Sequence, residues 1–135
     1  MAIFVDTSAL YAALSADDEC HADARAQWDA VLAADEPLVT TSYVLAETCA
    51  LLGRRLGVQA VRDFDAAFAP VLEVRWVDAA LHERAVAAYL AANRRDLSLV
   101  DCASFEVMRA RGLVVVFAFD THFAEWGFRC LPETA

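Results

Sequence analysis

The sequence predicts an α/β domain with a mainly parallel central sheet of about five strands. Three observations lead to this prediction. Short apolar runs alternate along the chain with segments of helical periodicity. The runs at residues 2–5 and 113–119 are apolar throughout, as expected for strands that are buried on both faces of a parallel sheet. The 135 residues contain no repeat, linker or low-complexity segment, so we expect a single domain over residues 1–135.

The expected strands are recognised by their apolar character and by the polar residues at which they end. The first run stops at Asp6 and the longest one stops at Asp120. Asp6 is therefore placed at the carboxyl end of a strand, where open α/β sheets bind their ligands. The expected strands cover residues 2–5, 37–40, 71–77, 113–119 and 128–131.

The expected helices are delimited by capping residues and helix breakers. Ser98 is a good N-cap, and Asp101 three residues later completes a capping box. Asp78 caps the preceding helix, while Pro70 and Gly112 end two others. The expected helices cover residues 9–16, 19–34, 42–53 or 42–57, 58–68, 79–93 and 99–112, with a short helical turn at 121–126.

The composition restricts the partners that the chain can bind. Its net charge is -9, and all 11 basic residues are arginine, because the sequence contains no lysine. Such a chain cannot attract nucleic acid by its general field, so a polyanion would have to be held locally by metal ions and a few arginines. The hydrophobic fraction of 59% leaves apolar surface for a second copy of the chain or for a protein partner.

The sequence also predicts a cytoplasmic protein with reduced cysteines. The N-terminal residues have no basic region, and no apolar run approaches the ~20 residues of a membrane span. The four cysteines are far apart and form no CxxC pair, so neither a zinc site nor a disulfide framework is indicated.

Four carboxylates from four separate elements can converge at one edge of the sheet. Two expected strand ends offer Asp6 and Asp120, and two helices offer Glu47 and Asp101. Glu47 lies on a largely apolar helix face, where a half-buried carboxylate must be paired, protonated or bound to a metal.

Some of these carboxylates also have simpler explanations. Asp6 and Asp101 can act as helix caps, and Arg54 or Arg55 can pair with Glu47. From the residues alone, both readings of each carboxylate stay open.

Such a cluster indicates metal-dependent chemistry. Two carboxylates about 4 Å apart repel by roughly 4 kcal/mol at an effective dielectric constant of 20, so the cluster needs protons or cations. An all-oxygen site suits Mg²⁺ or Mn²⁺, and such ions support phosphodiester hydrolysis. Glycine-rich phosphate loops and a GxSxG elbow are absent from the sequence. Receiver-type and dehalogenase-type sites also place a carboxylate after the first strand, but they rely on a lysine that this chain lacks.

Four motifs, in this order and at these spacings, resemble the PIN-domain ribonucleases and, within them, the VapC-like toxins of bacterial toxin–antitoxin pairs. The motifs are VDTS at residues 5–8, Glu47, LSLVDC at residues 97–102 and FDTHF at residues 119–123. The likeness extends over nearly the whole chain and implies a PIN-like three-layer α/β/α sandwich. One departure is Ala118, where relatives often carry a hydroxyl residue that supports the last acid.

The resemblance implies a metal-dependent endoribonuclease. Asp6, Glu47, Asp101 and Asp120 would be the catalytic, metal-binding acids. Thr7 and Ser98 would supply supporting hydroxyls. The likeness further implies a homodimer and a cognate antitoxin that covers the site.

Four arginines are candidates for holding RNA phosphates, although they could equally be solvated helix ends. They are Arg54, Arg55, Arg94 and Arg95. The alternative to an enzyme is a non-catalytic PIN-like scaffold that binds RNA or a protein partner, and a DNA-directed nuclease of the same chemistry is a third possibility.

Overall fold

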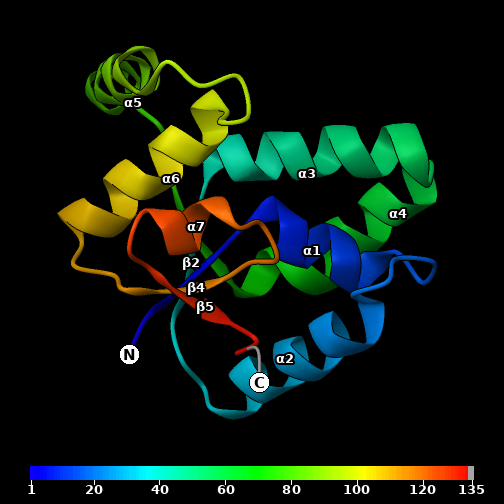
Figure 1. Ribbon diagram of the computed structural model, residues 1–135. Coiled ribbons are helices and arrows are strands. Elements are labelled where there is room, and N and C mark those ends of the chain that lie inside the picture. Colours follow the sequence, from blue (N-terminus) through cyan, green and yellow to red (C-terminus); the bar gives the residue numbers. More distant parts are fainter. Residues whose placement is uncertain (134–135) are drawn as a thin grey trace.

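A five-stranded parallel sheet forms the centre of the computed structural model, which describes residues 1–133 (Figure 1). Each pair of neighbouring strands is parallel. The order across the sheet is β3-β2-β1-β4-β5. The strands are β1 (Ile3–Val5), β2 (Leu38–Thr41), β3 (Leu72–Arg75), β4 (Val115–Phe117) and β5 (Arg129–Leu131). The predicted α/β class and strand number are confirmed.

Helices lie on both sides of this sheet and make the three-layer sandwich that was expected. In Figure 1, α6 lies on one side of the strands and α2 on the other. The helices are α1 (Thr7–Leu14), α2 (His21–Ala33), α3 (Ser42–Arg55), α4 (Val58–Asp63), α5 (Ala79–Ala92), α6 (Leu99–Ala110) and α7 (His122–Glu125). A π-helical turn (Phe64–Phe68) and a 3₁₀ turn (Ala69–Val71) follow α4.

Some element boundaries differ from the prediction for a physical reason. The apolar run at 113–119 contributes only three residues to β4. At its two ends the backbone bonds away from the strand ladder: the Leu113 N–H donates to Met108 O at 2.8 Å, and the Phe119 N–H donates to Ser8 Oγ at 3.0 Å. Apolar character predicts burial, which Leu113 has, but it does not predict strand pairing.

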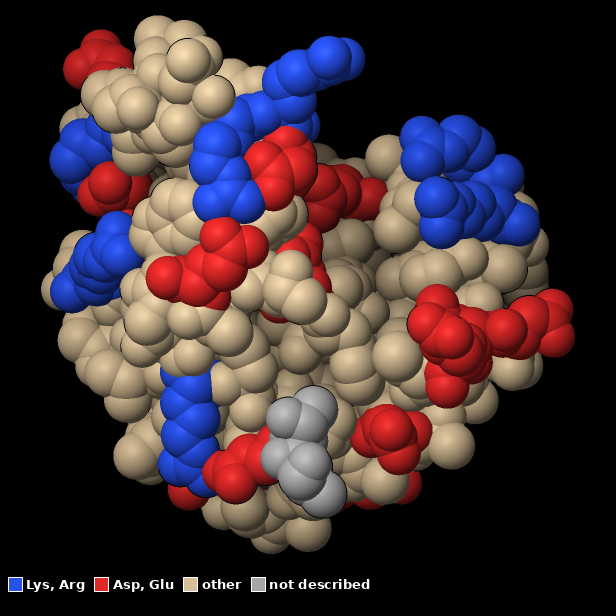
Figure 2. Space-filling model, in the orientation of Figure 1, with Lys and Arg blue, Asp and Glu red and all other residues tan. Residues whose placement is uncertain are grey.

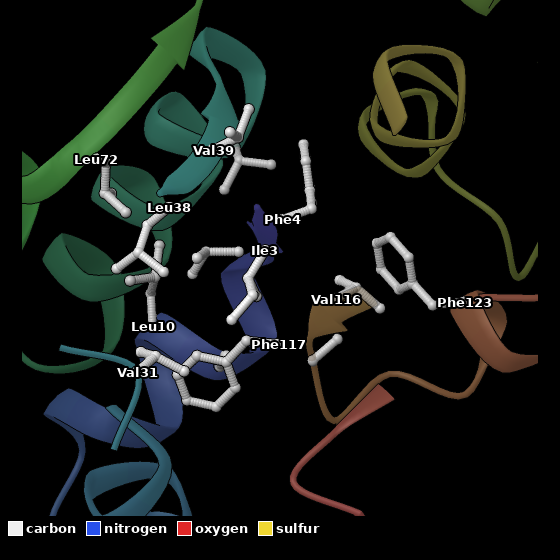
Figure 3. Packing of buried hydrophobic residues seen from close by; sticks show 14 of the residues in the cluster. Ile3, Phe4, Leu10, Val31, Leu38, Val39, Leu72, Val116, Phe117 and Phe123 are labelled. Atoms are coloured by element: carbon white, nitrogen blue, oxygen red, sulfur yellow. The ribbon is translucent and has the colours of Figure 1, made fainter. Parts of the chain in front are cut away.

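The three central strands, β1, β2 and β4, are buried on both faces (Figure 3), whereas the edge strands β3 and β5 are partly exposed. On one face, Ile3 and Phe117 lie near Val31 of α2. On the other face, Phe4 lies near Phe123 of α7, with 6.4 Å between the ring centroids. This two-sided core fixes the strand ends against the helices that follow them.

The order in which the chain adds strands to the sheet reverses between β1 and β4. From β1 the chain continues outward through β2 and β3, whereas β4 and β5 lie on the other side of β1. The carboxyl ends of β1 and β4 are joined directly, because the Asp6 N–H donates to Phe117 O at 3.1 Å. A crevice outside such a reversal is the usual ligand site of open α/β sheets.

Two further features concern the cysteines and the length of the helices. The four cysteines are all free, as predicted. None of the helices between residues 1 and 133 combines the length and the apolar character that a bilayer span requires.

Candidate active site

Asp6 follows β1 and caps α1. Its backbone is extended, and its carboxylate accepts the Ser8 N–H at 3.1 Å and the Ser8 hydroxyl at 2.6 Å. The proposed helix cap is therefore present. The carboxylate is also buried at the mouth of the β1–β4 crevice, so capping does not exclude a role in binding.

Asp101 likewise has a structural role. The Ser98 hydroxyl accepts the Asp101 N–H at 3.0 Å, and the Asp101 carboxylate accepts the Ser98 N–H at 3.1 Å, which makes the predicted capping box. Only one carboxylate oxygen takes part in this bond. Capping uses part of the bonding capacity of Asp101, and the remaining lone pairs are available on the cleft side.

Glu47 lies in the middle of α3, one turn after Tyr43, and its side chain is half-buried. Within residues 1–133 no arginine forms an ion pair with it, so the simple pairing with Arg54 or Arg55 is not observed. Thr7 connects α1 to the same helix, because its hydroxyl donates to Val44 O at 3.4 Å and accepts from Thr48 at 3.1 Å.

Asp120 lies three residues after β4, at the start of α7. Its Oδ1 atom accepts the His122 N–H at 2.9 Å. The His122 ring stands between this carboxylate and Asp101, with Nδ1 2.7 Å from Asp120 Oδ1 and 3.7 Å from Asp101 Oδ2. One ligand atom from each of these three residues lies within 4.8 Å of the others, so the group could hold a metal ion.

The structure brings all four predicted acids together in one cleft of about 520 Å³. Thr7 and Ser98, the predicted supporting hydroxyls, also line it. Figure 2 shows carboxylate side chains in a hollow between two groups of arginines, one over the end of α3 and the other over the loop between α5 and α6. The cleft is lined by Asp6, Thr7, Ser8, Glu47, Ala50, Leu51, Arg54, Asp96, Ser98, Asp101 and Asp120.

Burial and neighbouring negative charges raise the pKa values of Asp6, Glu47 and Asp101. Burial raises the pKa of Asp6 to about 7, and the charges of Asp101 and Glu47 contribute, although the Ser8 hydrogen bonds oppose the shift. Burial also raises the pKa of Glu47 and of Asp101, and the charge of Asp120 adds to both shifts. A set of buried carboxylates that destabilise one another's charged forms fits a divalent cation, which relieves this repulsion.

The four arginines differ in how they relate to this cleft. Arg54 lines it, and the Arg55 guanidinium lies over the Tyr11 ring at 5.5 Å in the adjoining groove. Arg94 is bound to Asp96 and, at 2.7 Å, to Glu125, whereas exposed Arg95 lines a separate hollow at the end of α5. RNA binding by these arginines stays a prediction.

Three polar residues in or beside the cleft were not predicted from the sequence as site residues: Ser8 and Asp96, which line it, and His122, which contacts its acids. Ser8 could have been found from its position two residues after an N-cap aspartate, where its N–H and hydroxyl reach the cap. Asp96 and His122 are 26 residues apart, and their contact depends on how α7 packs beside α6. No spacing signal reveals that contact.

Comparisons with known proteins agree with this geometry. A family model described as the PIN domain matches residues 3–129. Two curated proteins from Mycobacterium tuberculosis, of strains CDC 1551 / Oshkosh and ATCC 25618 / H37Rv, are each named 23S rRNA-specific endonuclease VapC20. Each is 40% identical to this chain over 128 residues, which is 93% of this chain and 95% of the relative.

A solved structure is similar as well. The crystal structure of Mycobacterium tuberculosis VapC20, described as a Sarcin-Ricin loop cleaving toxin, superposes with a TM-score of 0.81 at 37% sequence identity. The match covers 93% of this chain and 95% of that chain.

Proposed function

The chain belongs to the PIN-domain family, and we propose that it is a metal-dependent endoribonuclease and the toxin of a toxin–antitoxin pair. One observation carries this proposal: Asp6, Glu47, Asp101 and Asp120 line a single cleft at the reversal point of the sheet. The names of the similar proteins support RNA as the substrate class.

The acids divide into holding and positioning roles. Asp6, Asp101 and Asp120 would hold Mg²⁺ or Mn²⁺, and Glu47 would bind the same ion or orient the attacking water. When bound, the ion supplies the Lewis acidity that phosphodiester hydrolysis requires. Burial raises the pKa of Glu47, which makes its carboxylate a stronger proton acceptor for that water.

Other residues of the cleft would hold these acids in position and bind the RNA. The Ser8 hydrogen bonds hold the Asp6 carboxylate, and the capping box with Ser98 holds Asp101. Arg54, on the rim formed by α3, is placed to bind a substrate phosphate, which a protein of net charge -9 needs because its general field repels RNA.

The relatives also suggest which RNA is cut and which protein controls the cutting. We propose a loop of 23S rRNA as the substrate, which places the activity in the cytoplasm, and an antitoxin that covers the acidic cleft with a basic side chain. Large apolar side chains are exposed outside the cleft, among them Trp76 at 68% and Leu90 at 67%. We propose that exposed apolar side chains of this kind contribute to a homodimer interface.

The proposal is tested by incubating the purified protein with 23S rRNA and Mg²⁺ or Mn²⁺. Cleavage at defined positions is expected, with loss of cleavage in EDTA and in Asp6→Asn. Asp78→Asn, which changes the exposed cap of α5, is the control and should cut normally.

Three outcomes would contradict the proposal. Wild-type protein that binds RNA with metal present but does not cut it would favour the scaffold alternative. Cleavage of DNA but not RNA would favour the DNA-directed nuclease. An Asp6→Asn variant that fails to fold would assign Asp6 a structural role.

A further inference from the structure

The His122 ring lies beside the cleft, against three of its acids, Asp96, Asp101 and Asp120. Its Nδ1 atom is buried and has no hydrogen-bond partner among the described residues. Asp120 Oδ1 is only 2.7 Å away, but the angle at the ring nitrogen does not suit a hydrogen bond. That oxygen already accepts the His122 backbone N–H at 2.9 Å. A buried nitrogen this close to a carboxylate, without a hydrogen bond between them, requires an explanation.

The other ring nitrogen is fixed by Asp96. His122 Nε2 lies 3.2 Å from Asp96 Oδ2, and Asp96 is held in turn by two nitrogens of Arg94, at 2.5 Å and 3.0 Å. Because a carboxylate only accepts hydrogen bonds, Nε2 is the nitrogen that carries the proton. Nδ1, on the other edge of the ring, faces the acids, 2.7 Å from Asp120 Oδ1 and 3.7 Å from Asp101 Oδ2.

A cation shared between Nδ1 and the carboxylates resolves this arrangement. A proton on Nδ1 makes no hydrogen bond with Asp120 in this geometry, whereas an ion bound by both atoms lies off the line that joins them and can use the lone pair of the neutral ring. The contact of Asp96 with Nε2 is the hydrogen bond that commonly orients a metal-binding histidine. We propose that His122 Nδ1, with Asp101 and Asp120, is a ligand of the catalytic divalent ion. This inference rests on the proposed function and adds a nitrogen to its all-oxygen site.

A nitrogen ligand changes the choice of ion. Imidazole suits transition metals, whereas Mg²⁺ prefers oxygen ligands. We therefore expect the site to bind Mn²⁺ more tightly than Mg²⁺. This preference should be larger than the one that four carboxylates alone would give.

Pulsed electron paramagnetic resonance of bound Mn²⁺ tests the inference, because it detects a directly bonded imidazole nitrogen through its ¹⁴N coupling. The coupling is expected in the wild type and should be absent in His122→Gln. Glutamine can still donate to Asp96 but has no atom equivalent to Nδ1. His21→Gln and His82→Gln are matched controls that should keep the coupling, because those rings contact Ala12 O and the Tyr43 hydroxyl instead.

Calorimetry supplies the second readout. His122→Gln is expected to weaken Mn²⁺ binding by about tenfold or more, in the range of changes at metal sites, and Mg²⁺ binding by less. Wild-type protein that binds Mn²⁺ without ¹⁴N coupling would overturn the inference and leave the nuclease proposal standing. Wild-type protein that binds neither ion would overturn both.

Discussion

The Ser8 hydroxyl donates a 2.6 Å hydrogen bond to the Asp6 carboxylate and accepts the Phe119 N–H at 3.0 Å. One side chain thus ties the residue after β1 to the segment after β4. Ala118, whose side chain has no hydroxyl, adjoins this contact. Ser8, at the carboxyl end of the neighbouring strand β1, supplies a hydroxyl that supports the segment before Asp120.

Replacing Ser8 with alanine is expected to destabilise the protein. The change removes a charge-assisted bond and leaves the Phe119 N–H without a partner, at a cost of about 1–2 kcal/mol in the free energy of unfolding. Denaturant titration of the wild type and the variant measures this difference in the free energy of unfolding. Ser104→Ala, which removes a hydroxyl bonded to Val100 O within α6, is the control for a hydroxyl outside the cleft. In metal titrations, only Ser8→Ala should change the affinity.

The stability of the metal-free protein should fall as the pH rises. Burial raises the pKa of Asp6 to about 7, whereas an aspartate in the unfolded chain titrates near 3.9. A carboxyl group with a raised folded-state pKa stabilises the fold fully below about pH 4, and this contribution is lost as the pH rises through about 7. In EDTA, the wild type should therefore be more stable near pH 5.5 than near pH 8.

Asp6→Asn is the control for this pH dependence, because asparagine has no proton to lose. Its free energy of unfolding should vary less between the two pH values and should exceed that of the wild type near pH 8. If the two proteins show the same pH dependence, Asp6 is not the group responsible.

Asp101 serves as both a helix cap and a candidate ligand, and one pair of variants separates the two roles. Asp101→Asn keeps an oxygen that can accept the Ser98 N–H but loses the charge, so Mn²⁺ affinity should fall at least about tenfold, or 1.4 kcal/mol. Asp78→Asn makes the same change at the N-cap of α5, away from the cleft. Calorimetry that finds equal Mn²⁺ affinities in the two variants would leave Asp101 as a cap only.

Arg54→Gln should weaken RNA binding. If Arg54 contacts a phosphate, its loss reduces the slope of log affinity against log salt concentration by about 0.7 for single-stranded RNA. The binding is measured by anisotropy in Ca²⁺ with the Asp6→Asn protein, so that cleavage does not interfere. Arg62→Gln removes an equally exposed arginine that bonds Gln59 on α4, and it should leave the slope unchanged.

The strand ends and helix caps were predictable because they depend on local chemistry. Asp78 and Ser98 cap their helices as expected, since a side-chain oxygen that follows an extended segment meets the free N–H groups of the next helix. Asp6 and Asp120 were placed correctly because parallel strands end at the same edge of a sheet. Glu47 was grouped with them because a half-buried carboxylate on an apolar helix face needs a partner, and the family resemblance supported the grouping.

What could not be predicted depends on packing between distant segments. The sequence offers Arg94 as a free cation at the end of a helix, but Asp96 and Glu125 surround its guanidinium. The role of His122 was missed because two of the acids that it contacts, Asp96 and Asp101, belong to the loop before α6 and to α6 itself. Such contacts are specified by tertiary structure, and a spacing along the chain does not encode them.

The pairing of β1 with β4 has a consequence for the synthesis of the protein. Phe4 pairs with Val116, so the strands that precede Asp6 and Asp120 are more than a hundred residues apart in the sequence. Asp6 and Glu47 are translated early, and Asp101 and Asp120 emerge late. A nascent chain that stops before β4 cannot assemble the acids, so the ribosome that makes this protein completes most of it before any cleft exists.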